Sequence, residues 1–169
     1  LTLNENNYHE WFVDGELNMS YLCIDKHVDE GFGDQIAVIY DSPVTQQQIK
    51  YTFHQLKDEV AKLAGGLKSL GLKKGDTAIV YMPMIPQTLF AMLACARLGV
   101  IHNVVFGGFA PQELVVRIDD CQPKVMITAT AGVEITKRIP YLPLVEKAIE
   151  LAKDKVENII VFNRKLTEN

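Results

Sequence analysis

The chain has 169 residues, 48% of them hydrophobic, which suffices for one substantial core of about a single domain. Its formal net charge of -4 offers no bulk attraction to nucleic acid or to an anionic membrane, so neither is expected as the primary partner. The most apolar helix that the sequence predicts, residues 87–98, is too short to cross a bilayer, and no membrane anchor is expected.

The first 34 residues are predicted to form an amino-terminal region that wraps against a main domain spanning residues 35–169. Trp11 and Phe12 precede a polar turn, and we interpret them as packing anchors because large aromatic side chains mostly serve burial. Residues 21–28 suggest one short helix. The pattern is otherwise irregular, so the predicted role of this region is to pack against the domain that follows.

Residues 36–40 form a short apolar strand, and a polar, hairpin-like connection follows over residues 41–49. Thr52 with Gln55 three residues later fits a capping box, which marks the start of a helix. The apolar residues of that helix recur every four or three positions and form one stripe, which consists of Leu56, Val60, Leu63, Leu67 and Leu70. Gly71 ends the helix.

A strand, helix and strand at the centre of the chain organise the rest of it. An apolar strand covers residues 77–82, the apolar helix 87–98 follows, and a second apolar strand ends at Phe106 before two glycines. This pattern predicts a buried βαβ unit with parallel strands. Because the helix is apolar nearly all round, we expect the unit in the middle of a larger sheet, with ligands at the carboxyl ends of the strands.

The same pattern repeats to the end of the chain. A helix is predicted over residues 111–122, a strand over residues 124–129 and an irregular segment over residues 130–143. A further helix begins at Leu144, and a last strand covers residues 158–162. Strands that alternate with helices predict an α/β fold, a mostly parallel sheet with helices on both faces.

Residues that usually carry catalysis are sparse. The four histidines lack metal-ligand spacing, and neither a Gly-x-Ser-x-Gly elbow nor a Walker loop is present. The glycines at positions 31 and 33 precede a strand rather than a helix, which does not fit a dinucleotide fingerprint. Three scattered cysteines without a CxxC pattern indicate reduced thiols in an intracellular compartment.

Two loops remain as candidate binding elements. Gly107 and Gly108 follow a buried strand, and their backbone could approach a flat or anionic ligand; the alternative is a tight strand-to-helix turn. Lys137 and Arg138 form a small cationic cluster able to hold a phosphate; the alternative is a solvated basic turn. Because the loops follow consecutive strands, they could face one ligand together.

Several segments resemble, in order, the amino-terminal part of AMP-forming short-chain acyl-CoA synthetases, the acetyl- and propionyl-CoA synthetase group of the adenylate-forming superfamily. These segments are Trp11-Phe, Gly15-Glu-Leu-Asn, Tyr40-Asp-Ser-Pro, Tyr51-Thr-Phe, Lys74-Gly-Asp, Tyr81-Met-Pro-Met-Ile-Pro, Met92-Leu-Ala-Cys-Ala-Arg-Leu-Gly and Val105-Phe-Gly-Gly-Phe. The segments beginning at Tyr40 and Pro140 are most similar to the short-chain family member 3 type, which favours propionate and resides in the mitochondrial matrix. A cytosolic location is the alternative.

The resemblance implies the amino-terminal part of the family's large domain, with ATP, coenzyme A, Mg²⁺ and a short-chain carboxylate as cofactors and substrates of the full-length enzyme. It assigns the loop of Phe106, Gly107 and Gly108 to the adenine of coenzyme A, and the segment of Glu134, Ile135, Thr136 and Lys137 to its 3'-phosphate. Family members usually carry arginines where Glu134 and Lys137 stand. We therefore expect Lys137 to be the phosphate ligand, with Arg138 as its possible substitute, and not Glu134.

The family's phosphate loop, adenine-binding motif, hinge aspartate and carboxyl-terminal lysine have no counterparts in the sequence. Without those groups the pyrophosphate leaving group is not stabilised, so we expect this stretch alone to be an inactive amino-terminal fragment, truncated at its carboxyl end. The rival hypothesis is a non-catalytic, flavodoxin-like nucleotide-binding or regulatory module. A phosphoacceptor module of that kind would need Asp41 or Asp76 in an acidic pocket at the strand ends.

Overall fold

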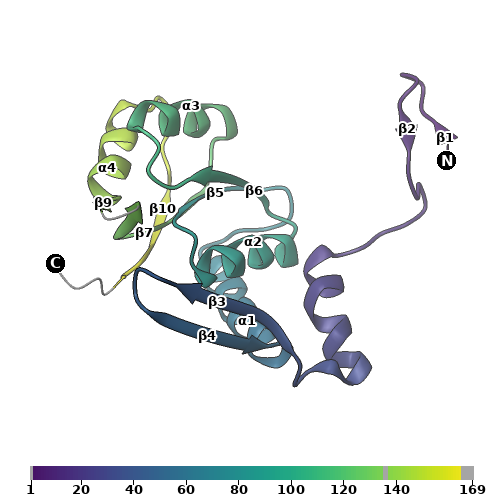
Figure 1. Ribbon diagram of the computed structural model, residues 1–169. Helices are drawn as coiled ribbons and strands as arrows, with labels where there is room; N and C mark the ends of the chain where they lie inside the picture. Colours follow the sequence, from purple (N-terminus) through teal and green to yellow (C-terminus); the bar gives the residue numbers. More distant parts are fainter. Residues whose placement is uncertain (1, 135–136, 165–169) are drawn as a thin grey trace.

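A parallel sheet of four strands lies at the centre of the molecule (Figure 1). The computed structural model describes residues 2–134 and 137–164. The strand order is β10-β7-β5-β6, and the strands are β5 (Thr77–Met82), β6 (Ile101–Phe106), β7 (Val125–Ala129) and β10 (Asn158–Phe162). All three pairings are parallel, so the predicted α/β fold with a parallel sheet is confirmed.

Helices cover both faces of the sheet, as the alternation of strands and helices predicts (Figure 1). The helices are α1 (Phe53–Ser69) and α2 (Pro86–Leu98) on one face, with α3 (Pro111–Cys121) and α4 (Leu142–Leu151) on the other. Successive residues of a strand point to opposite faces. Ala78, Val80 and Met82 of β5 therefore pack with α1 and α2, whereas Ile79 and Tyr81 pack with α3 and α4.

Local sequence signals set the helix ends. Thr52 accepts a hydrogen bond from the Gln55 backbone N–H at 3.2 Å, and the Gln55 side chain accepts one from Thr52 N–H at 2.9 Å, which confirms the capping box. Pro86 stands in the first turn of α2, where its missing N–H costs no helical hydrogen bond. Gly99 ends α2 with a φ of 70°, a left-handed conformation that glycine adopts without strain.

The position of β6 differs from the prediction. We expected both strands of the central βαβ unit inside the sheet, but β6 is an edge strand, and among the described residues no strand pairs with its far side. Val105 is buried, whereas Ile101 and Phe106 are 62% and 66% exposed. An apolar strand sequence predicts contact on its faces, but it does not specify pairing on both edges. The interior strand of the unit is β5, which pairs with β6 and β7.

Two antiparallel hairpins accompany the sheet. The first joins β3 (Ile36–Ser42) to β4 (Gln47–Thr52), in agreement with the predicted hairpin-like connection. The second joins β8 (Ala131–Glu134) to β9 (Lys137–Pro140) in the segment that we expected to be irregular. That expectation is wrong because strands of four residues are too short for a periodic pattern. Helix α4 also begins two residues earlier than predicted.

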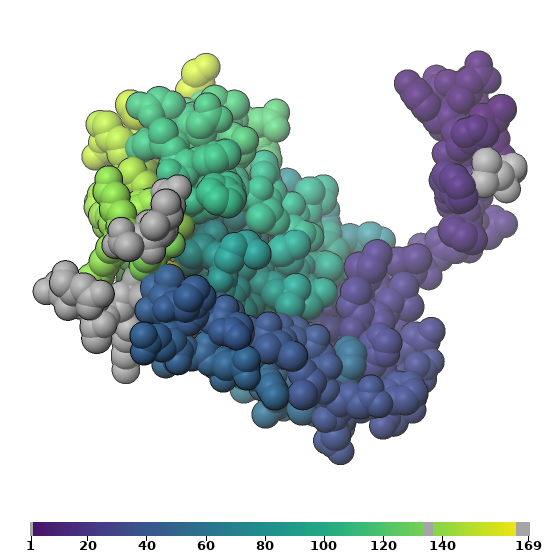
Figure 2. Space-filling view, in the orientation of Figure 1, coloured from purple at the N-terminus to yellow at the C-terminus, as the bar shows by residue number. Residues whose placement is uncertain are grey.

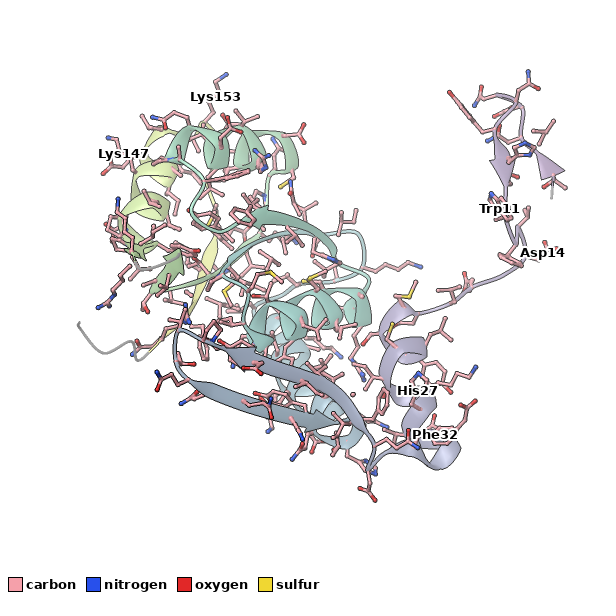
Figure 3. The ribbon with its side chains drawn as sticks, in the orientation of Figure 1. Trp11, Asp14, His27, Phe32, Lys147 and Lys153 are labelled. Atoms are coloured by element: carbon pink, nitrogen blue, oxygen red, sulfur yellow. The ribbon has the colours of Figure 1, made fainter. Side chains whose placement is uncertain are left out.

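The amino-terminal segment extends away from the sheet (Figures 1 and 2). It contains the strands β1 (Thr2–Leu3) and β2 (His9–Glu10), which pair antiparallel. Trp11, labelled in Figure 3, is 68% exposed and Phe12 is 83% exposed, so their interpretation as packing anchors is wrong. Large aromatic residues usually pack, but residue type does not identify a partner. The division of the chain at residue 34 stays a prediction.

A helical segment of residues 19–32, kinked at Gly31 with a φ of 88°, does pack against α1. It includes the elements η1 (Tyr21–Asp25) and η2 (Val28–Phe32). Asp25, which is 8% exposed, holds this segment in place through ion pairs with Arg97 of α2 and Lys57 of α1. Two nitrogens of the Arg97 guanidinium contact the two carboxylate oxygens. One carboxylate therefore joins three helical elements. None of the helices described is long and apolar enough to span a membrane.

Candidate functional site at the carboxyl edge of the sheet

The carboxyl ends of β5, β6 and β7 lie at one edge of the sheet because the three strands are parallel and in register. The loop after β6 contains Gly107 and Gly108, and the β8–β9 hairpin follows β7. A Cβ atom built on Gly108 would lie 3.6 Å from the Cδ1 atom of Ile139 in β9. A side chain at Gly108 would therefore contact β9. The loop of Gly107 and Gly108, which we call the glycine turn, and the β8–β9 hairpin with Lys137 and Arg138, which we call the cationic hairpin, thus share one edge of the sheet, as predicted.

Glycine is required at both positions of this turn, for different reasons. Gly108 has a φ of +96°, which is strained for any residue with a side chain. A Cβ atom on Gly107 would lie 2.2 Å from the hydroxyl oxygen of Tyr141 and 2.8 Å from the carbonyl oxygen of Met82. Both distances are too short for nonbonded contacts, so the backbone at Gly107 occupies space that a side chain would fill.

The turn is hydrogen-bonded to a buried tyrosine beneath it. Tyr81 of β5 is 0% exposed, and its hydroxyl accepts a hydrogen bond from the Gly108 N–H at 3.2 Å. The same hydroxyl donates to the Phe109 carbonyl oxygen at 2.9 Å. Burial raises the pKa of Tyr81 above its usual value, although the Gly108 N–H acts in the opposite direction. The phenol therefore stays protonated at neutral pH and remains a donor.

A second buried tyrosine joins the turn to the hairpin. Tyr141, which follows β9 directly, is 3% exposed, and its ring centroid lies 5.0 Å from that of Tyr81. Cβ atoms built on Gly107 and Gly132 would lie 2.2 Å and 2.3 Å from the Tyr141 hydroxyl oxygen. The hydroxyl therefore fits between two glycines, one in the turn and one in β8. The Tyr141 backbone N–H also donates to the Thr130 carbonyl oxygen at 3.0 Å.

Aromatic surface and positive charge flank the turn. The rings of Phe106 and Phe109 lie 5.7 Å apart and are 66% and 37% exposed as residues. The guanidinium carbon of Arg117 lies 5.6 Å from the centre of the Phe109 ring, within the range of a cation–π contact. A flat, partly charged surface of this kind can stack against an aromatic ligand and attract an anionic one.

The predicted phosphate ligands lie on the neighbouring hairpin. Lys137 and Arg138 are the first residues of β9 and are exposed, and neither forms an ion pair with another described residue. Glu134 ends β8, where the register pairs its backbone with that of Lys137. Ile135 and Thr136 lie outside the described residues. Exposed cations beside a glycine turn provide charge for binding an anion.

Tyr81, Tyr141 and Gly132 contribute to this site, although none of them was among the residues predicted for it. The signal for Tyr81 was available: a tyrosine in an otherwise aliphatic, buried strand must find a partner for its hydroxyl. For Tyr141 and Gly132 there was none, because their contact depends on a hairpin whose strands the sequence did not predict. Among the residues described, no group of three or more histidines, cysteines or carboxylates could hold a metal ion.

A doubly covered parallel sheet with a glycine turn at its carboxyl edge is the architecture of α/β proteins that bind nucleotides and related ligands. Residues 25–169 match the family of AMP-binding enzymes. The chain therefore belongs to that family.

Proteins with similar sequences support this family membership. An uncharacterized protein of Pseudomonas aeruginosa is 56% identical over 156 residues, covering 92% of this chain and 25% of that protein. The acyl-CoA synthetase short-chain family member 3, mitochondrial, of Homo sapiens is 51% identical over 154 residues, 91% of this chain and 22% of that protein. An acetyl-coenzyme A synthetase of Pseudoalteromonas atlantica is 47% identical over 90% of this chain and 24% of its own length. The chain thus spans 22–25% of these relatives.

Proposed function

We propose that the full-length protein is an AMP-forming short-chain acyl-CoA synthetase. In the first step, a carboxylate oxygen of propionate or acetate attacks the α-phosphorus of ATP, and pyrophosphate leaves. In the second, the thiol of coenzyme A releases its proton to solvent and attacks the acyl carbon of the resulting acyl-adenylate, so that the thioester forms and AMP leaves. The observation that carries this proposal is the glycine turn beside an exposed cationic pair, in a chain about half identical to proteins named as such synthetases.

The part of the enzyme proposed for this chain is a portion of the coenzyme A site. Phe106, Gly107 and Gly108 would lie against the flat adenine, which the exposed Phe106 ring and the bare glycine backbone support. Lys137 would bind the 3'-phosphate, with Arg138 beside it, and both side chains are exposed. A carboxylate close to a phosphate is unfavourable, so Glu134 is not proposed as a direct ligand.

Ile135 and Thr136 complete the segment proposed to meet the phosphate. ATP and Mg²⁺ are proposed for the full-length enzyme. Among the described residues, no group of three or more histidines, cysteines or carboxylates could hold a metal ion, and no step above depends on one. We propose the mitochondrial matrix as the location, by analogy with mammalian relatives that are named as mitochondrial, with the cytosol as the alternative.

A flavodoxin-like regulatory module is less well supported than the synthetase. Asp76 immediately precedes β5, at the amino end of the strand, where its carboxylate pairs with the Lys124 ammonium at 2.9 Å. Asp41 lies in the separate β3–β4 hairpin. Neither carboxylate is at the carboxyl edge of the parallel sheet, where a phosphoacceptor would be needed.

The proposal is tested with protein expressed from the complete reading frame that contains this chain. We expect exchange of labelled pyrophosphate into ATP that depends on propionate or acetate, and thioester formation when coenzyme A is added. The control omits the carboxylate. A protein that binds nucleotide but shows neither carboxylate-dependent exchange nor thioester formation would contradict the synthetase and favour the module.

A further inference from the structure

We propose that Tyr81 and Tyr141 are positioning residues, which shape the glycine turn and fix it to the cationic hairpin so that coenzyme A meets one preformed surface. The inference rests on the proposed function and extends it to two residues that do not touch the ligand. Both are buried, at 0% and 3% exposure, so any effect on binding must pass through the loops above them.

Tyr81 sets the shape of the turn. The Tyr81 hydroxyl bonds two successive residues of the loop, as acceptor from the Gly108 N–H and as donor to the Phe109 carbonyl. These bonds hold a backbone that includes a φ of +96° at Gly108. A phenylalanine at position 81 would keep the ring and its packing, and it would lose both hydrogen bonds. The turn would then adopt the proposed conformation for only part of the time.

Tyr141 sets the distance between the two loops. The Tyr141 hydroxyl lies in the gap left by Gly107 in the turn and Gly132 in β8, while the backbone of Tyr141 bonds to Thr130 at the base of the hairpin. The Tyr141 ring also packs at 5.0 Å against Tyr81. A shift of the hairpin relative to the turn would drive one of these backbones into the hydroxyl. The tyrosine pair therefore fixes Lys137 and Arg138 relative to the turn.

Fixing the two loops before the ligand binds favours binding. A ligand that must order two independent loops loses affinity, and a preformed surface avoids that cost. The adenylation half-reaction uses carboxylate and ATP but not coenzyme A, so the positioning pair should affect only the second half-reaction. This separation distinguishes positioning from a general role in folding, since a folding defect lowers both half-reactions together.

The test is Tyr81→Phe in protein expressed from the complete reading frame, with Tyr51→Phe as the matched control. Tyr51 is half-buried and packs edge-on against Phe90, in the core on the opposite face of the sheet. We expect Tyr81→Phe to raise the KM for coenzyme A about tenfold, as for the loss of one to two net hydrogen bonds. The rate of carboxylate-dependent pyrophosphate exchange should be retained, and Tyr51→Phe should change neither quantity.

Each other outcome overturns the inference in a recognisable way. If wild type forms thioester and Tyr81→Phe leaves the KM for coenzyme A unchanged, positioning is refuted while the proposed function stands. If Tyr81→Phe lowers exchange and thioester formation in equal proportion, its role is structural and positioning is again refuted. If wild type itself shows no carboxylate-dependent exchange, the proposed function fails, and the inference fails with it.

Discussion

Asp25 provides a direct test of how the amino-terminal helical segment is attached. Asp25→Asn keeps the shape of the side chain and removes its charge, so Arg97 and Lys57 lose the anion that they share. The Arg97 Nε atom is already buried without a hydrogen-bond partner among the described residues, so in the variant little would offset the charge of the guanidinium. We expect Asp25→Asn to destabilise the protein substantially.

The size of the effect follows from the exposure of the partners. Removing one member of a fully buried ion pair costs about 3–5 kcal/mol. Here the side chains of Arg97 and Lys57 are 24% and 34% exposed, so solvent screens part of the charge. Because of this screening, we expect Asp25→Asn to lower the free energy of unfolding by about 2 kcal/mol. At a denaturant dependence of about 2 kcal/mol per molar, the urea midpoint should fall by about 1 M.

The assay is equilibrium unfolding in urea, with Glu30→Gln as the control. Glu30 belongs to the same segment and pairs with Lys26 at 3.7 Å, but both side chains are about half exposed. Such a surface pair contributes less than about 0.5 kcal/mol, so the midpoint should shift by less than about 0.25 M. Equal midpoints for Asp25→Asn and Glu30→Gln would refute the claim that Asp25 anchors the segment.

Two further predictions use single side chains. Cys95 is fully buried, and burial raises the pKa of its thiol to about 11. Iodoacetamide at neutral pH should therefore alkylate the exposed Cys23 far faster than Cys95, as measured by peptide mass spectrometry. Similar rates for the two thiols would contradict the packing of α2. The Lys124 ammonium and the Lys73 backbone N–H lower the pKa of Asp76, so its stabilisation is present above about pH 4 and is lost as pH falls through the lowered value. Asp76→Asn should therefore reduce the urea midpoint at neutral pH, and this difference from wild type should shrink as the pH is lowered to about 3. A difference that does not depend on pH would contradict the ion pair.

Much of the fold could be predicted from local signals. The capping box at Thr52 and Gln55, the prolines that begin α2 and α3, and the alternation of strands and helices all depend on near neighbours in sequence. The partner of β6 and the exposure of Trp11 depend on contacts between distant segments, and a single sequence does not encode these in any local pattern. The sequence therefore predicts where the long helices and strands lie in the chain, but it does not predict that β6 lies at the edge of the sheet.

The candidate site shows the same division. Two loops that follow parallel strands must reach the same edge, so the approach of Gly108 to Ile139 follows from the fold class. The tyrosine pair does not follow from it. Tyr141 reaches Gly107 because β8 and β9 form a hairpin, and the contact is possible because glycine stands at position 132.

The most direct test of the central claim is discrimination between coenzyme A and its analogue without the 3'-phosphate. If the glycine turn and the cationic hairpin form one coenzyme A site, wild type should prefer coenzyme A in kcat/KM by about tenfold or more, as for a charge-assisted hydrogen bond. The double variant Lys137→Ala, Arg138→Ala should lose that preference and retain carboxylate-dependent pyrophosphate exchange. A double variant that still prefers coenzyme A as strongly as wild type does would contradict the account.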